Sequence, residues 1–286
     1  MIYAICNPVA GNGRGRKIAR QAEDALRKLG KQCTFIMTEG PGHATQLAAQ
    51  VPDGEMVLAI GGDGTSLEVA RGLVGTRKSL GIIPAGTGND FIKTLGVPSD
   101  PMEALDYVLS HPARETDVGR INDSIFLNEA GAGFDVAVLD EAGRAKKYCR
   151  GMLPYLYGVI RALFRFRPIS IAYQVDDGGW ATKDVFVIGA ANGGVIGGGI
   201  TIAPEAEADD GLLDVVLVDK VRPSRLPLRL IGLLRGKILD FPETTYIKAR
   251  SLLFSAPDMR VNVDGEVFSL SEADIRILPK ALLIHR

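Results

Sequence analysis

The chain has 286 residues, of which 46% are hydrophobic and 23% are charged, as in an ordinary globular protein. This length suits two domains, and the formal net charge of -1 gives no overall attraction to nucleic acid. Three cysteines that lie far apart, Cys6, Cys33 and Cys149, match neither a disulfide framework nor a zinc site. We therefore expect reduced thiols and no nucleic-acid partner.

The N-terminal sequence MIYAICNPVAG has no basic segment and no long apolar run, so it predicts no signal peptide. No other stretch reaches the ~18 uninterrupted apolar residues that a membrane span requires. These patterns predict a soluble, cytoplasmic protein.

The first hundred residues alternate between strand patterns and helix patterns. The expected strands are 2–6, 32–37, 56–60 and 80–84, and the expected helices are 13–30, 44–50, 65–74 and 100–112. Gly30 is expected to end the first helix, and Asp100 to cap the last one ahead of Pro101. Apolar strands separated by helices predict a parallel, Rossmann-like α/β sheet that is covered on both faces.

After about Glu115 the pattern changes to short strand-like runs separated by Gly, Asp and Asn turns. Runs of this kind predict an antiparallel, β-sandwich-like second domain, which two helical insertions around 135–166 and 224–239 interrupt. We place the domain boundary near Asp117. The expected organisation is an α/β domain over 1–117 and a β-rich domain over 118–278.

The segment IGGDGT, residues 60–65, leaves an apolar strand through glycines and opens a helix at once. Glycines let the backbone approach a phosphate, and a helix N-terminus supplies free N–H groups. Asp63 would repel a phosphate unless Mg²⁺ bridges the two. The alternative is a tight turn in which Asp63 serves as a helix cap.

A second loop, GIIPAGTGNDF at residues 81–91, repeats this design one strand later, with Asn89 and Asp90 before a helix. Both loops are expected at the carboxyl ends of parallel strands, where ligands bind. The first loop, residues 7–17, is a third candidate, with Asn7 on the nucleotide. Together the loops predict a nucleoside triphosphate site.

Five motifs, taken in order, resemble the bacterial diacylglycerol kinase-like lipid kinases, a family that extends to sphingosine and ceramide kinases. They are GGDGT at 61–65, PAGTGNDF at 84–91, NEAGAGFD at 128–135, DDGLLDV at 209–215 and VDGE at 263–266. GGDGT alone is shared with NAD kinases, whereas the later four favour the lipid branch. The resemblance covers essentially the whole chain.

The resemblance implies a nucleotide domain followed by a β-rich lipid domain, with the end of the chain, about 279–286, returning to the first. It implies ATP contacts at these residues: Asn7, Thr38, Gly61, Gly62, Asp63, Gly64, Thr65, Ser66, Leu67 and Thr87. One departure is Ala10, where the family often has a serine that bonds to the nucleotide.

The motif VNVDGEVF contains two carboxylates, Asp264 and Glu266, near a strand end. Strand alternation puts residues i and i+2 on one side, so we expect both carboxylates to face one cleft. The resemblance implies that Glu266 accepts the proton of the substrate hydroxyl, with Asp264 as its neighbour and a metal ligand. The alternative is a plain Asp-Gly hairpin turn.

The stretch from Ala142 to Val175 has no acidic residue and mixes basic with aromatic side chains, which suits an anionic membrane surface. The alternative is a solvated helix pair packed on the sandwich. The basic and aromatic residues include Arg144, Lys146, Lys147, Tyr148, Arg150, Tyr155, Tyr157, Arg161, Phe164, Arg165, Phe166 and Arg167.

The turn at 203–215 brings together Glu207, Asp210 and the backbone carbonyl of Leu212, a set of oxygens that suits Mg²⁺ or Ca²⁺. The resemblance implies that this group of lipid kinases binds a structural cation there. The alternative is a solvent-exposed acidic turn.

These patterns predict an ATP- and Mg²⁺-dependent lipid kinase that phosphorylates a hydroxyl of a membrane lipid, with diacylglycerol as the first candidate. The predicted catalytic residues are Asp63, Asp90, Asp264 and Glu266. It would be cytoplasmic and peripherally membrane-associated. Two alternatives are an NAD kinase, which shares GGDGT, and a non-catalytic nucleotide- or lipid-binding regulator. The oligomeric state is open, a homodimer included.

Overall fold

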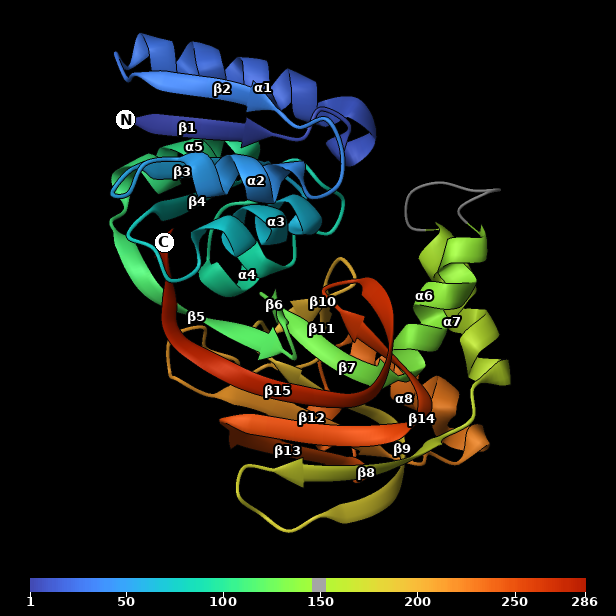
Figure 1. The fold of residues 1–286 in the computed structure, drawn as a ribbon. Helices are drawn as coiled ribbons and strands as arrows, with labels where there is room; N and C mark the ends of the chain where they lie inside the picture. The colour runs from blue at the N-terminus through green and yellow to red at the C-terminus, as the bar shows by residue number, and fades with distance from the viewer. Residues whose placement is uncertain (146–152) are drawn as a thin grey trace. The chain divides into compact units, whose positions relative to one another are not determined.

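The computed structural model describes residues 1–145 and 153–286, and Figure 1 shows its helices and strands. Contacts divide the chain into two compact units. Unit 1 comprises 1–118, 208–210 and 278–286, and unit 2 comprises 119–207 and 211–277. Two strands, β5 (Ala113–Ile121) and β15 (Glu266–His285), have residues in both units.

Unit 1 is built on a parallel sheet in the order β2-β1-β3-β4, with the last residues of β15 beside β4. Its strands are β1 (Ile2–Cys6), β2 (Cys33–Met37), β3 (Met56–Gly61) and β4 (Ser79–Pro84). On β3, the four consecutive side chains from Val57 to Ile60 are fully buried. Since successive side chains point to opposite faces, both faces of the sheet are covered, which confirms the predicted architecture.

The helices of unit 1 are α1 (Ala10–Lys28), α2 (His43–Gln50), α3 (Asp63–Leu73), α4 (Phe91–Leu95) and α5 (Pro101–Ser110). The predicted cap of α5 is confirmed, because Asp100 Oδ1 accepts hydrogen bonds from the backbone N–H groups of Met102 and Glu103, at 2.8 and 3.1 Å. Gly30 follows α1 with a left-handed φ of 66°, as predicted for a residue that ends a helix.

Unit 2 consists mainly of antiparallel strands, as the turn-punctuated sequence predicts. Its strands are β6 (Ser124–Phe126), β7 (Glu129–Gly133), β8 (Ile169–Val175), β9 (Ala181–Ala191), β10 (Val195–Ile196), β11 (Ile200–Thr201), β12 (Leu213–Asp219), β13 (Thr244–Ala249) and β14 (Ser251–Val263). β12 pairs with β9 and β13, and β14 pairs with β7, β8 and β15. Leu252 and Phe254, two residues apart on β14, are both fully buried in the core.

The helices of unit 2 are α6 (Phe134–Ala145), α7 (Leu153–Arg165) and α8 (Leu226–Leu234). They occupy the two predicted helical insertions. α6 and α7 pack closely, since a Cβ at Gly158 would lie 2.5 Å from the carbonyl oxygen of Val138. Within the described residues, no helix is both long and apolar enough to span a membrane. The predicted surface residues Lys146, Lys147, Tyr148 and Arg150, as well as Cys149, lie outside the described residues.

Candidate active site

Strand register brings the predicted loops of unit 1 to one edge of the sheet. Gly61, the last residue of β3, lies opposite Pro84, the last residue of β4. The Gly61 carbonyl oxygen accepts a hydrogen bond from the N–H of Ala85 at 2.6 Å. The N–H of Asn7, which follows β1, donates to the carbonyl oxygen of Ile60 at 2.9 Å. Three loops therefore begin side by side at the carboxyl ends of β1, β3 and β4.

Glycines allow these loops to touch through their backbones. A Cβ at Gly86 would lie 2.5 Å from the Cα of Gly62, which is too close for any side chain. Gly11, with a φ of 56°, is equally restricted, because its Cβ would lie 2.1 Å from the carbonyl oxygen of Ala85. Any larger residue at these positions would push the loops apart, so the glycines fix the shape of the site.

Two of the predicted nucleotide residues contact each other. Asn7 Nδ2 donates a hydrogen bond to the hydroxyl of Thr65 at 3.1 Å, and Asn7 Oδ1 accepts one from the N–H of Val9. Thr65 and Ser66 are buried at the start of α3, whereas Thr87 is exposed in the second loop. Thr38 begins the segment after β2, and its N–H donates to the carbonyl oxygen of Cys6 at 2.9 Å.

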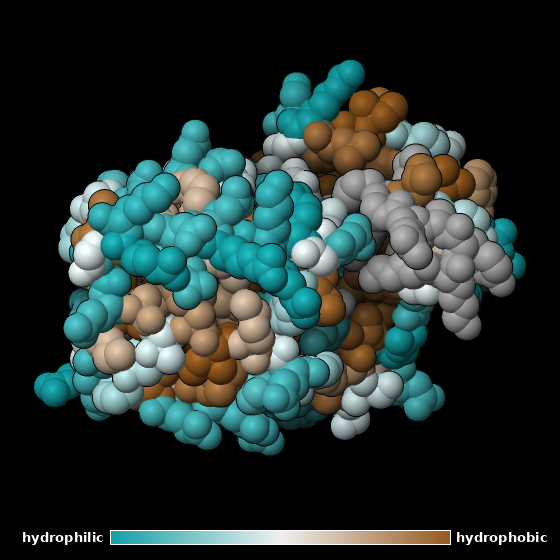
Figure 2. Space-filling view, turned by 90° about the horizontal axis from the view of Figure 1, so that it is seen from above, coloured by the Kyte–Doolittle hydropathy of each residue, from teal (hydrophilic) through white to brown (hydrophobic). Residues whose placement is uncertain are grey.

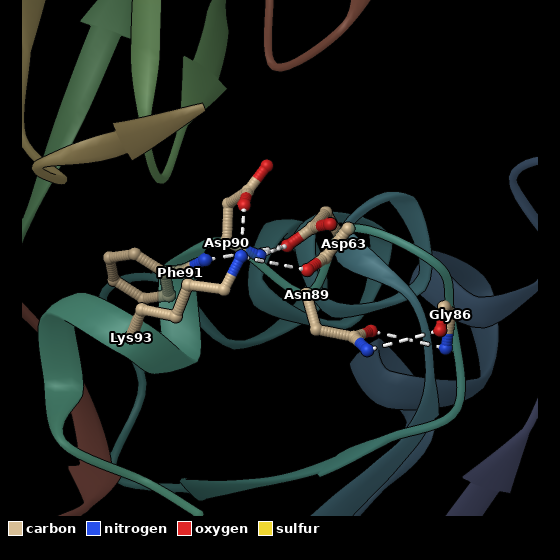
Figure 3. Close-up of polar contacts among 7 residues, drawn as sticks. Asp63, Gly86, Asn89, Asp90, Phe91 and Lys93 are labelled. Carbon is tan, nitrogen blue, oxygen red and sulfur yellow. Dashed lines mark hydrogen bonds and ion pairs between the residues drawn. The ribbon is translucent and has the colours of Figure 1, made fainter. Parts of the chain in front are cut away.

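Asp63 connects the first glycine loop to the second (Figure 3). Its Oδ1 accepts hydrogen bonds from the N–H of Asp90 at 2.6 Å and of Phe91 at 3.4 Å. Asp63 therefore serves as a cap, but for α4, which begins 28 residues later in the sequence, and not for its own helix. The sequence predicted capping as an alternative to metal binding. In the structure one carboxylate oxygen of Asp63, Oδ1, caps a helix.

Asp90 and Asn89 organise the second loop. The ammonium group of Lys93 lies 2.7 Å from Asp90 Oδ1 and donates to the carbonyl oxygen of Gly88 at 3.1 Å (Figure 3). The Asn89 side chain exchanges two hydrogen bonds with the backbone of Gly86. The sequence did not predict Lys93 as a site residue, because a single lysine on a helix does not form a recognisable motif. Only the fold places it beside Asp90.

The environment of Asp63 disfavours its charged form. Burial, followed by the nearby Asp90 carboxylate, raises the pKa of Asp63 above its usual range, although hydrogen bonds from backbone N–H groups oppose this shift. A Cβ at Gly88 would lie 2.9 Å from Asp63 Oδ2 and 3.3 Å from Asp90 Oδ2. Two carboxylate oxygens thus border the space that glycine leaves open. Such oxygens are the ligands that Mg²⁺ prefers, so these residues fit that ion.

In unit 2, Asp264 makes a different set of contacts. Its carboxylate accepts hydrogen bonds from the backbone N–H groups of Leu127, Asn128 and Glu129, at 2.6, 2.9 and 3.0 Å. Both of its oxygens are used in these bonds. Asp264 thus joins the β14–β15 hairpin to the segment that leads into β7.

The expectation that Asp264 and Glu266 share one side of a strand is wrong. β14 ends at Val263 and β15 begins at Glu266, and these two residues pair across the hairpin. Asp264 and Gly265 form the two-residue turn between them, with left-handed φ angles of 48° and 89°. Alternation holds only along a continuous strand, so it does not relate the two carboxylates. Glu266 is exposed at the start of β15.

A buried polar network supports this hairpin. Asn262 Nδ2 donates to Glu129 Oε1 at 2.6 Å and to Asp135 Oδ2 at 3.1 Å, while Asn262 Oδ1 accepts from the N–H of Gly265 at 2.8 Å. Burial raises the pKa of Asp135, and the hydrogen bond from Asn262 opposes this shift. Asn262 is missing from the prediction, although Glu129 and Asp135 belong to the motif NEAGAGFD.

The predicted structural-cation residues lie in an exposed turn. The side chains of Glu207 and Asp210 are exposed, and Leu212 is half-buried. The neighbouring Asp209 already has a cation partner, because its Oδ2 lies 2.6 Å from the guanidinium of Arg286. Among the described residues, no group of three or more His, Cys, Asp or Glu side chains forms a metal site.

Comparison with known proteins gives the family. The chain matches the model of the diacylglycerol kinase catalytic domain over residues 1–121. It matches that of the YegS C-terminal NAD kinase beta sandwich-like domain over residues 128–286. A crystal structure of a candidate diacylglycerol kinase from Bacillus anthracis strain Sterne superposes with a TM-score of 0.82 at 27% identity, covering 99% of this chain and 94% of that one.

Curated relatives match over nearly their whole length. A diacylglycerol kinase of Mycobacterium tuberculosis is 31% identical, covering 100% of this chain and 94% of its own. A candidate YegS-like lipid kinase of Chromohalobacter salexigens is 30% identical, covering 96% of this chain and 90% of its own. These relatives favour a lipid kinase over both an NAD kinase and a non-catalytic regulator. The chain therefore belongs to the family of bacterial diacylglycerol kinases and YegS-like lipid kinases, and it is a lipid kinase.

Proposed function

We propose that this protein transfers the γ-phosphoryl group of ATP to the free hydroxyl of diacylglycerol, which yields phosphatidic acid and ADP. The observation that carries the proposal is the meeting of three glycine-rich loops around Asp63 at the carboxyl edge of the unit 1 sheet. Backbone that approaches so closely, next to the N-terminus of α3, is suited to holding phosphate groups. The named activity of the curated relatives supports diacylglycerol as the acceptor.

In this proposal, residues of the loops hold the nucleotide. Asn7 and Thr38 lie after β1 and β2, Thr87 lies in the second loop, and the segment from Gly61 to Leu67 presents the N–H groups at the start of α3. The Asn7–Thr65 hydrogen bond supports this assignment, because it ties the loop after β1 to that helix.

Asp63 and Asp90 would hold the Mg²⁺ that accompanies ATP. A bound Mg²⁺ neutralises charge on the phosphate oxygens as the phosphoryl group moves. The raised pKa of Asp63 supports this role, since a nearby cation would relieve the repulsion between the two carboxylates. The ion pair with Lys93 holds the Asp90 carboxylate in place through its Oδ1 atom.

Glu266 would accept the proton of the lipid hydroxyl. As the hydroxyl oxygen bonds to the γ-phosphorus, the bond to the β–γ bridging oxygen breaks and the proton passes to the Glu266 carboxylate. Its exposed position supports this role, because substrate can reach it. Asp264, with both oxygens accepting backbone N–H groups, is better suited to shaping the turn than to binding metal.

The outer face of α7 would bring the enzyme to the membrane. Leu153, Tyr157, Ile160 and Phe164 recur at helical spacing and are exposed, Phe164 to 86%. Figure 2 shows that hydrophobic side chains, in brown, gather on parts of the molecular surface. An amphipathic helix of this kind, with arginines nearby, suits an anionic bilayer.

The arginines of this region do not all point to a membrane. Arg144, Arg161 and Arg165 all lie within 4 Å of the single carboxylate of Glu141, on α6. Reversing their charge would therefore disturb the packing of α6 against α7 as well as any lipid contact. The exposed apolar side chains of α7 are the cleaner probes of membrane binding.

We also propose that Glu207, Asp210 and the carbonyl of Leu212 bind a structural Mg²⁺ or Ca²⁺. Support comes from the chemistry of the donors, which are all oxygens within six residues of chain. The neighbouring Asp209 is paired with Arg286, so we do not include it among the proposed ligands.

The test is phosphorylation with γ-labelled ATP of a panel that holds diacylglycerol, phosphatidylglycerol, sphingosine and NAD. Label in phosphatidic acid is expected, and its loss in Asp63→Asn would exclude a contaminating kinase. Label in NAD, or in another lipid of the panel at a higher rate, would overturn the proposed acceptor.

A further inference from the structure

Helix α8 exposes an apolar face that the proposed chemistry does not use. The helix, LPLRLIGLL, contains no buried residue. Leu228, Ile231 and Leu234 are exposed to 65%, 47% and 62%. At about 100° per residue these three side chains fall within roughly 120° of the helix circumference, so they form one continuous face. We call Leu228, Ile231 and Leu234 the α8 outer face.

The opposite side holds α8 firmly against unit 2. Leu226 and Leu233 pack on a cluster of buried valines from β12 and the residues after it. Arg229 lies 2.9 Å from Glu243 and stacks on the ring of Phe241, with its guanidinium carbon 5.0 Å from the ring centroid. The exposure of the outer face is thus a fixed property of the fold.

Basic residues flank the α8 outer face along the chain. No acidic residue occurs between positions 220 and 239, a stretch that holds Lys220, Arg222, Arg225, Arg229, Arg235 and Lys237. Two of these, Arg225 and Arg229, face Glu243. Arg222, Arg235 and Lys237 are exposed near the two ends of the helix. The helix therefore combines an exposed apolar face with exposed basic residues near both of its ends, a rim that Asp240 follows in the chain.

We propose that the α8 outer face inserts into the interfacial region of an anionic lipid bilayer, as a docking element separate from α7. A helix of this length lies in the plane of the interface, with its apolar side among the acyl chains and its basic ends at the headgroups. A second copy of the chain fits less well, because it would bring an identical basic rim against this one. Three side chains also offer far less area than a stable dimer buries.

Helices α7 and α8 are both linked to strand β9 through Phe186, which allows them to act together. Phe186 of β9 packs on the same valine cluster as Leu226 and Leu233. Its ring also stacks on Phe134, at the start of α6, and makes an edge contact with Phe166, just after α7. In Figure 1 both α7 and α8 lie at the right-hand side of unit 2. The membrane role rests on the proposed lipid substrate, but its test does not require turnover.

The test measures binding of the full chain, without ATP, to vesicles of phosphatidylcholine with and without phosphatidylglycerol. The variant Leu228→Ser/Ile231→Ser/Leu234→Ser removes the outer face, and Ile247→Ser/Trp180→Ser removes exposed apolar side chains elsewhere in unit 2 as a matched control. Phe164→Ser reports the contribution of α7. Since all these side chains are exposed, thermal unfolding should be nearly unchanged, and this is checked first.

We expect the triple serine variant to bind phosphatidylglycerol vesicles at least about tenfold more weakly, while the control binds as the parent does. A tryptophan placed by Ile231→Trp in a Trp180→Phe background, which removes the single native tryptophan, should shift its emission to the blue on vesicle binding. Lipids brominated on their acyl chains should quench that emission.

Equal vesicle binding by the parent and the triple serine variant would overturn the proposal, as would an equal loss in the control. A parent that elutes as a dimer, with a monomeric triple variant, would assign the face to a second copy and also overturn it. Activity on a short-chain, dispersed diacylglycerol separates the two proposals. Loss of this docking role leaves that activity intact, whereas no label transfer to diacylglycerol in the parent would overturn the proposed function instead.

Discussion

Two aspartates, one in each unit, accept backbone N–H groups from a distant segment of the chain, but they do so to different extents. In unit 1, Asp63 uses Oδ1 to accept from Asp90 and Phe91, and its Oδ2 borders the space beside Gly88. In unit 2, Asp264 uses both oxygens for three N–H groups. The first carboxylate lies beside another carboxylate, and the second accepts hydrogen bonds from three consecutive N–H groups.

This difference fits the proposal that Asp63 serves the chemistry, whereas Asp264 serves the fold. Because the pKa of folded Asp63 is raised, its contribution to stability is present at low pH and is lost as the pH rises through that pKa. The charged form of Asp63 therefore stabilises unit 1 less than the protonated form does. A position that keeps a carboxylate at such a cost is typical of an active site. The three hydrogen bonds to the Asp264 carboxylate all come from backbone N–H donors, which favour its charged form.

The largest expected effect comes from the hairpin of unit 2, at Glu266. If Glu266 accepts the hydroxyl proton, Glu266→Gln should lower kcat by about 10²–10⁴-fold with little change in the KM for ATP, because glutamine keeps the shape but cannot take the proton. Steady-state kinetics on dispersed diacylglycerol measure both constants. A variant that changes only the KM for ATP would mean that Glu266 binds substrate and is not the base.

Asp63→Asn is the next test, and it carries two opposite predictions. Turnover should fall by about 10²–10³-fold, since a charge that holds Mg²⁺ is lost. In a chelator at neutral pH, however, the variant should melt at a higher temperature than the parent, because the unfavourable charge is gone while asparagine keeps an acceptor for the N–H of Asp90.

If removal of the Asp63 charge causes the higher melting temperature of Asp63→Asn, the effect should depend on pH and on Mg²⁺. The difference in melting temperature should shrink as the pH falls, because the parent then protonates Asp63. Adding Mg²⁺ with ATP should stabilise the parent more than the variant. A variant that melts below the parent at neutral pH would show that capping of α4 outweighs the charge repulsion, and the contrast with Asp264 would fail.

Asp264→Asn should give a smaller effect, and one of the opposite sign on stability. Asparagine tolerates the left-handed φ of 48°, so the turn itself is not strained by the change. It replaces one acceptor oxygen with a donor group that faces backbone N–H groups, which should lower the free energy of unfolding by about 1–3 kcal/mol. Chemical denaturation followed by circular dichroism measures this. An unchanged stability together with a lost Mg²⁺ dependence of turnover would restore the role of metal ligand.

The same residues show which parts of the site the sequence can predict. The cap at Asp100 and the turn residue Gly30 act within three or four positions along the chain, so local chemistry identifies both. Strand order and glycine spacing likewise place the loops at one edge of the sheet. The partners of Asp63 and Asp264 are different, since they lie 27 and about 135 residues away. No local pattern distinguishes a carboxylate that will meet N–H groups from one that will meet a cation.

The smallest expected effect concerns the acidic turn around Asp210. If Glu207 and Asp210 bind a structural cation, Asp210→Ala should lower the free energy of unfolding by about 1 kcal/mol in Mg²⁺ or Ca²⁺ at a few times the dissociation constant. It should cause little further loss once a chelator is present, because the metal is then absent from the parent too. Asp209→Asn is the matched control.

That control separates the cation from the ion pair beside it. Asp209 lies 2.6 Å from the guanidinium of Arg286, so its replacement should destabilise the protein equally with and without chelator. The side chain of Asp209 is 48% exposed and that of Arg286 13%, so we expect this partly accessible ion pair to contribute about 1 kcal/mol. Because both variants remove one negative charge from the same turn, a general charge effect would move them together. If Asp210→Ala follows Asp209→Asn under both conditions, the turn holds no cation, and Asp210 affects stability through its charge alone.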